Sequence, residues 1–220
     1  MPQRYTVLAH HREISHEIEI KRSRFLCVLR RVQSEDEARE LIAELRRRHH
    51  DARHHCSAFV LGADRMIQRS NDDGEPSGTA GIPMLDALAK REIADGSVLS
   101  DVLAVVVRYF GGIKLGAGGL VRAYSDAVSS GLDHAPLHLR QRLRIFAFTA
   151  SHAQAARYEN ELRAAGYQVE PTEWQAQHAI VRIGIPDTEQ AAQELHTHIA
   201  TLTSGAATLN STNTQWVDLI

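Results

Sequence analysis

The segment Val102–Tyr124 constrains the fold of this chain more than any other stretch. It reads VLAVVVRYFGGIKLGAGGLVRAY: an apolar run ends at Val107, glycines follow at positions 111, 112, 116, 118 and 119, and apolar residues at helical spacing begin at Leu120. A Val-rich run bounded by glycines is typical of a strand buried on both faces, so the segment predicts a strand, a loop and a helix. The unpaired amides and the dipole at the N-terminus of such a helix favour an anion beside the loop.

The overall composition excludes several classes of protein. The 220 residues carry a net charge of −2, and no apolar run is long enough to span a membrane. The N-terminus lacks the apolar segment of a signal peptide, and Cys27 and Cys56 lie in apolar runs typical of buried free thiols in a reducing compartment. We therefore expect a cytoplasmic protein. Residues 1–140 hold 20 Lys and Arg against 19 Asp and Glu, so any contact with nucleic acid should be local and in the N-terminal part.

Two domains are expected, residues 1–135 and residues 136–220, because the stretch Ala135–Arg140 contains a proline and marks a change in charge balance. The first domain is expected to open with a hairpin formed by Tyr5–His10 and Ile14–Ile20. A capping-box pattern at Ser34 predicts the start of a helix.

The second domain has the order strand, helix, strand, strand, helix, strand, which is the ferredoxin-like split βαβ arrangement. Its second strand is expected at Tyr167–Trp174, and Asp187 is expected to cap its second helix.

The glycine-rich loop matches no nucleotide-binding motif. Gly111 and Gly116 have the spacing of a P-loop, but Ala117 and Gly118 stand where that motif requires Lys and then Ser or Thr. Position 121 also lacks the last glycine of the dinucleotide-binding fingerprint. Tight packing between strand and helix, which only glycine permits, explains all five glycines without a ligand. We therefore expect no cofactor.

A polar turn precedes the expected second helix, with the sequence RSNDDGEPSGTAG over Arg69–Gly81. Its side chains with potential chemistry are Asp73, Glu75, Ser77 and Thr79. The turn lacks the further donors of a calcium loop and the elbow of a nucleophilic serine, so a turn in which Asp side chains accept from backbone amides is favoured. His54 opens a strand that faces this turn, and a structural histidine is favoured there over a zinc ligand. No metal is expected.

Several cationic residues flank strand ends or the glycine loop: Lys21, Arg22, Arg24, Arg108, Lys114 and Arg122. Together they would form a basic patch of the kind that holds RNA phosphates, whereas singly each is an ordinary solvated charge. Tyr109 and Phe110 would either stack on bases or pack in the core.

These blocks resemble the IMPACT family, in its bacterial YigZ-like form, over about residues 15–135. The matching motifs are Lys21-x-Ser23-Arg24-Phe25, His54-x-Cys56-x-Ala58, the block Asp72–Gly81, and Arg108–Gly116 with Gly118–Tyr124. The C-terminal part resembles the small domain of bacterial members, which is similar to domain V of the translocating elongation factor.

The resemblance implies an α+β fold. The N-terminal domain would be a two-layer α/β domain of the ribosomal-protein-like type with a left-handed βαβ crossover, followed by the ferredoxin-like domain. It also implies a role in the regulation of translation. Eukaryotic members carry an additional domain and bind a protein scaffold, a partner that does not transfer to this chain.

We therefore expect a non-enzymatic regulator of translation that binds RNA or the ribosome, with a protein partner in translational control as a further expectation. Neither DNA nor a membrane is an expected partner. The alternative is an enzyme acting on a phosphorylated or carboxylated small molecule, in a pocket formed by residues 72–81 with Arg108 and Arg122. The expected binding residues are Lys21, Arg24, His54, Asp73, Glu75, Ser77, Thr79, Arg108, Lys114 and Arg122.

Overall fold

A computed structural model describes residues 2–219, and the chain divides between Leu139 and Arg140 into two compact units. Both units combine helices with antiparallel sheets, so the expected α+β class is confirmed. No helix among the described residues is long and apolar enough to cross a membrane.

Unit 1 is built on a five-stranded sheet in which every pair of neighbours is antiparallel. In spatial order its strands are β2 (Ile14–Ile20), β3 (Ser23–Arg31), β6 (Val102–Tyr109), β4 (His54–Leu61) and β5 (Ile67–Asn71). The central strand β6 is the predicted Val-rich run. Its Arg108 lies opposite Phe25 of β3 and His54 of β4, so three strand ends meet at this residue.

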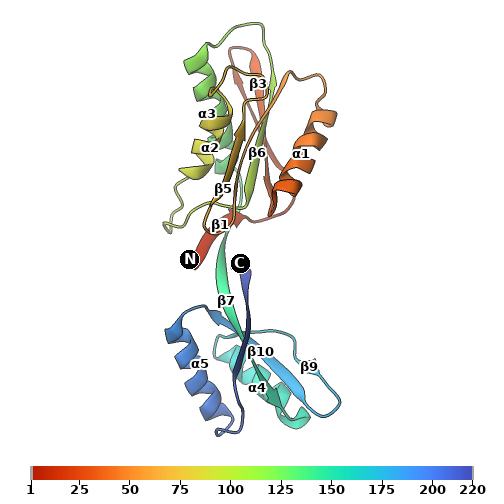
Figure 1. Cartoon of the computed structure of the whole chain (residues 1–220), viewed down its shortest axis with the longest axis vertical. Coiled ribbons are helices and arrows are strands. Elements are labelled where there is room, and N and C mark those ends of the chain that lie inside the picture. The colour runs from red at the N-terminus through yellow and green to blue at the C-terminus, as the bar shows by residue number, and fades with distance from the viewer. Residues whose placement is uncertain (1, 220) are drawn as a thin grey trace. The chain divides into compact units, whose positions relative to one another are not determined.

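Helices cover both faces of this sheet (Figure 1). On one face, Leu103, Val105 and Val107 of β6 pack with helix α1 (Glu35–Arg48). On the other, Val102, Ala104 and Val106 pack with α2 (Gly81–Ala89) and α3 (Ala117–Asp133). The alternation of side chains along a strand explains how one apolar run serves two cores. The unit therefore has three layers, one more than the resemblance implied.

The first strand, β1 (Arg4–Leu8), does not form the expected hairpin with β2. The Thr6 amide instead donates to the Val98 carbonyl over 2.8 Å, and the Ala9 amide donates to the Pro136 carbonyl over 2.9 Å. β2 pairs instead with β3, through the two-residue turn at 21–22, and is the edge strand of its sheet. By contrast, the predicted helix start at Ser34 is confirmed, since the Glu37 amide donates to the Ser34 hydroxyl over 3.1 Å, and the Glu37 carboxylate accepts from the Gln33 amide over 2.8 Å.

Unit 2 has the ferredoxin-like order of elements. They are β7 (Leu137–Ala150, which begins in unit 1), α4 (His152–Ala164), β8 (Gln168–Val169), β9 (Glu173–Trp174), β10 (Ala179–Pro186), α5 (Glu189–Leu202) and β11 (Asn210–Leu219). β7 lies between β11 and β10, and both β8 and β9 pair with the far edge of β10. Both helices share one apolar core with this sheet.

Two details of unit 2 differ from the sequence expectation. The strand expected at Tyr167–Trp174 is split into β8 and β9, because Pro171 interrupts the ladder. The cap of α5 is Thr188, whose hydroxyl accepts from the Ala191 amide over 3.2 Å. Asp187 is instead paired with Arg142 and Arg144.

Candidate functional site

A cavity of about 370 Å³ lies at the end of unit 1 where β4 begins, β6 ends and α3 begins. We call it the α3 pocket. Its lining includes Arg53, His54, Glu75, Arg108, Phe110 and Lys114, with residues 115–117 and Leu120. The sequence-predicted strand, loop and helix therefore do line a cavity that contains charged side chains, and the turn after β5 contributes Glu75 to it.

A buried ion pair lies in the wall of the α3 pocket. Arg108 Nη1 donates to Glu75 Oε1 over 2.5 Å, and the two side chains are 6% and 4% exposed. The Tyr124 hydroxyl donates to the same oxygen over 2.7 Å. Burial raises the pKa of Tyr124, so its phenol stays protonated and acts as a donor. Glu75 thus carries a charge that Arg108 balances inside the protein.

The remaining N–H groups of the Arg108 guanidinium have no acceptor among the described residues. Nε is buried without a hydrogen-bond partner. The bond from Nη1 to Glu75 is the only hydrogen bond that the Arg108 side chain makes to residues 2–219. The guanidinium lies 5.4 Å from the ring centre of Phe25 and 5.6 Å from that of Phe110. Aromatic rings therefore hold it in place while part of its hydrogen-bonding capacity is unused.

His54 is oriented by the backbone of the polar turn. Its Nδ1 lies 2.9 Å from the Asp73 carbonyl, which can only accept, so Nδ1 carries a proton. Its Nε2 lies 4.0 Å from Glu75 Oε1. The ring therefore contributes one polar nitrogen to the wall of the α3 pocket beside the buried ion pair.

The two aspartates of the turn are structural. The Asp72 carboxylate accepts from the amides of Gly78, Ala80 and Gly81 over 2.7–3.0 Å. Burial alone would raise the pKa of Asp72, but these three amides outweigh it and lower the pKa below its ordinary value. This confirms the interpretation of a turn held by Asp side chains, and the turn presents Glu75 to the pocket.

Asp73 does not line the α3 pocket. Its carboxylate accepts from the His55 amide over 2.6 Å and pairs with Arg46 over 2.5 Å. Both oxygens of Asp73 therefore already hold the turn against β4 and α1. Thr79 is buried and donates to the Pro76 carbonyl over 2.6 Å, while Ser77 is exposed outside the pocket lining.

The N-terminus of α3 faces the pocket without a cap. Gly116, with a φ of 75°, occupies the cap position, and the first turn carries neither a capping side chain nor an acidic residue. A Cβ atom added at Gly118 would meet nothing within 4 Å, so the space over this turn is open. The first-turn amides therefore remain available to an anion.

Two exposed cations complete the pocket. Arg53, just before β4, and Lys114, in the glycine loop, both line it, and neither has an ion-pair partner among residues 2–219. Arg53 was missed by sequence reasoning because nothing distinguishes a single arginine before a strand. Its position follows only once β4 is known to lie beside β6.

The other expected basic residues lie elsewhere. Arg24 pairs with Glu17 over 3.0 Å, and Arg122 is exposed on α3 outside the pocket lining. Lys21 belongs to the β2–β3 turn, against which Gly111 packs so closely that a Cβ atom would lie 2.0 Å from the Arg22 carbonyl. The lining of the α3 pocket therefore includes His54, Glu75, Arg108 and Lys114 but not Lys21, Arg24 or Arg122.

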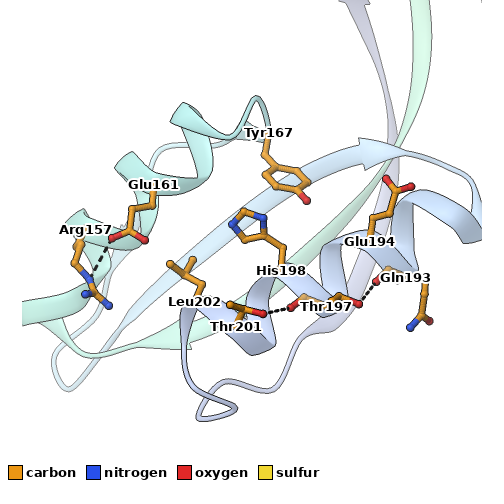
Figure 2. Close-up of a pocket in the computed structure, with 9 residues that line it drawn as sticks. All are labelled: Arg157, Glu161, Tyr167, Gln193, Glu194, Thr197, His198, Thr201 and Leu202. Carbon is orange, nitrogen blue, oxygen red and sulfur yellow. Dashed lines mark hydrogen bonds and ion pairs between the residues drawn. The ribbon is translucent and has the colours of Figure 1, made fainter.

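A larger cavity, of about 720 Å³, lies in unit 2 between α4 and α5 (Figure 2). The hydrogen bonds and the ion pair between the residues that line it each lie within a single helix. The hydroxyls of Thr197 and Thr201 donate to carbonyls one turn earlier, and Arg157 pairs with Glu161. It lacks the buried charges of the α3 pocket. Over the described residues there is also no group of three His, Cys, Asp or Glu side chains placed to hold a metal ion.

Comparison with known proteins shows that the α3 pocket lies in a part of the chain that matches a known family. A profile described as the Impact N-terminal domain matches residues 21–132, which include every residue of the pocket. The chain is 51% identical to the IMPACT family member YvyE of Bacillus subtilis over 152 residues, covering 69% of this chain and 67% of that protein.

The IMPACT family member YigZ of Escherichia coli is 37% identical over 175 residues, which cover 79% of this chain and 82% of that protein. A crystal structure described as that of a hypothetical protein is also similar. It has a TM-score of 0.61 and 31% identity, and the match covers 97% of this chain and 99% of that one. These matches support the assignment of the fold across both units.

Proposed function

Because this chain belongs to the IMPACT family, we propose that it regulates translation in the cytoplasm by binding RNA or the ribosome through the α3 pocket of unit 1. The family match supports the role in translation. The pocket supports the class of ligand, since it presents several donors and positive charges at one place on the protein.

The observation that carries the proposal is an unbalanced positive charge in a chain that is acidic overall. Arg53 and Lys114 line the pocket without carboxylate partners in the described part of the chain, while Glu75 is neutralised by Arg108. Cationic side chains at a helix N-terminus are suited to phosphate contacts, which supply most of the affinity for nucleic acids. Phe110, 45% exposed at the same pocket, offers a face on which a base can stack.

The test compares two double variants that remove the same charge. Arg53→Ala with Lys114→Ala alters the pocket, whereas Arg12→Ala with Lys90→Ala removes two exposed cations outside its lining. Binding to a labelled single-stranded RNA is followed by fluorescence anisotropy, and binding to ribosomes by co-sedimentation.

The pocket variant should bind RNA more weakly and reduce the slope of log affinity against log salt by about 1.4, or about 0.7 for each lost phosphate contact. The control variant should match the unmodified protein. Equal losses in both variants would show that only net charge matters and would contradict the proposal.

A phosphorylated small molecule is the second candidate ligand, because the pocket volume of about 370 Å³ lies in the usual range for small-ligand sites. In such a site Glu75 would be a poor general base, since its Oε1 already accepts from Arg108 and Tyr124. A thermal-shift screen of phosphorylated metabolites separates this candidate from RNA. Stabilisation by one metabolite, with no binding of RNA, would favour it.

A further inference from the structure

We propose that the α3 pocket recognises a phosphate monoester of a nucleotide, the dianionic end group of an RNA strand or of a free nucleotide, and not a phosphodiester inside a strand. This inference rests on the proposed function, because it names the part of the RNA that enters the pocket.

The charge of the pocket is the first argument. Arg108 and Glu75 cancel each other, which leaves one positive charge each from Arg53 and Lys114. The N-terminus of α3 adds about half a charge, so the pocket holds about +2.5. A phosphate monoester carries about −1.5 to −2 at neutral pH, whereas a diester carries about −1. The monoester is therefore the better electrostatic match.

The unused donors are the second argument. The first-turn amides of α3 are uncapped, and the buried guanidinium of Arg108 makes only one hydrogen bond to the described residues. Donors of this kind are normally satisfied, so their presence in the wall of a cavity indicates a ligand with several acceptor oxygens. A monoester has three such terminal oxygens, one more than a diester.

The exposed ring of Phe110 supplies the third argument. It lies on the Arg108 guanidinium at 5.6 Å on one side of the same cavity. Phe110 and the N-terminus of α3 line the same cavity. A nucleotide whose phosphate is held by α3 would therefore have the Phe110 ring available for stacking of its base. The pocket therefore fits one nucleotide with its end phosphate, and a sugar phosphate without a base would bind more weakly.

A pair of substitutions at one glycine tests whether the phosphate binds at the N-terminus of α3, a position we call the phosphate seat. Gly118 lies in the first turn of α3, and a Cβ atom there meets nothing within 4 Å. Gly118→Asp adds a negative charge to the first turn of α3, next to the lining residue Ala117, where the charge suits the helix dipole but repels a phosphate. Gly118→Ala adds the Cβ atom without the charge, and it is the matched control.

The binding of AMP, adenosine and ribose 5-phosphate is measured by isothermal titration calorimetry on the full chain. AMP should bind, adenosine should not, and Gly118→Asp should weaken AMP at least about tenfold while Gly118→Ala changes it less than about twofold. Thermal unfolding should show that Gly118→Asp is no less stable than Gly118→Ala. AMP binding of equal strength in both variants would overturn the phosphate seat.

The same oligoribonucleotide is then compared with a 5′-phosphate, a 3′-phosphate and no end phosphate. One of the phosphorylated forms should bind about tenfold more tightly than the form without an end phosphate. If all three bind equally and AMP does not compete, the monoester inference fails while RNA binding stands. If AMP binds and no RNA does, the monoester seat is supported and the RNA function is the one that fails.

Discussion

Replacing Glu75 by Gln should destabilise unit 1 by about 3 kcal/mol. The side chains of Arg108 and Glu75 are 6% and 4% exposed, so the substitution leaves a buried guanidinium without its counter-charge. Breaking one side of a buried ion pair costs about 3–5 kcal/mol. The lower end applies here, because the Gln side-chain oxygen can still accept from the Tyr124 hydroxyl, which donates to Glu75 over 2.7 Å.

Native-state hydrogen exchange measures this loss where it occurs. Amides of β6 report the opening free energy of unit 1, and amides of β10 in unit 2 serve as the internal reference. Tyr124→Phe is the matched variant, because it removes a hydrogen bond to Glu75 and keeps the ion pair. It should cost about 1.5–3 kcal/mol, the range for a bond to a charged acceptor, and no more than the Gln variant.

Inorganic phosphate adds a second readout. An anion in the α3 pocket would replace the missing carboxylate, and ligand at about ten times its dissociation constant would restore about 1.4 kcal/mol to the Glu75→Gln protein. A loss below about 1 kcal/mol in that protein would refute the reasoning, since it would show that Arg108 does not depend on Glu75.

Three further outcomes follow from the structure. Gly111→Ala should lower the free energy of unfolding in urea by more than about 2 kcal/mol, because its Cβ atom would lie 2.0 Å from the Arg22 backbone; wild-type stability would contradict this. The pKa of Asp72 is lowered on folding, so its contribution to stability is complete above the ordinary pKa of 3.8 and is lost as pH falls through the lower folded-state pKa. The free energy of unfolding of Asp72→Asn should therefore change less with pH in acid than that of the unmodified protein. Burial raises the pKa of Cys27 and Cys56 to about 12, so a thiol reagent at mildly alkaline pH should modify them only at the rate of unfolding.

Much of the framework could be predicted from local patterns. The continuous apolar run of β6, the helix cap at Ser34 and the turn held by Asp72 each depend on residues close in sequence. The hairpin expected at the N-terminus failed because β1 finds its partners around Val98 and Pro136, and a short apolar strand carries no signal for such distant neighbours.

The chemistry of the site was harder to predict. Arg108 and Glu75 are 33 residues apart, and only the fold reveals that one neutralises the other. Arg122, which has the same side chain in an equally glycine-rich setting, is exposed on α3. Sequence reasoning treated the two arginines alike because burial is a property of the packed chain and not of the local sequence.

The β2–β3 turn has a consequence for engineering. Lys21 and Arg22 have φ values of 48° and 64°, in a region that side chains other than glycine occupy at a cost of about 1–2 kcal/mol each. Grafting Asn-Gly into this turn would relieve that cost. It would also remove two cations next to Gly111 and take the net charge from −2 to −4. A thermostable version obtained in this way would therefore approach polyanions more slowly, and its gain in shelf life would be offset by a slower encounter rate.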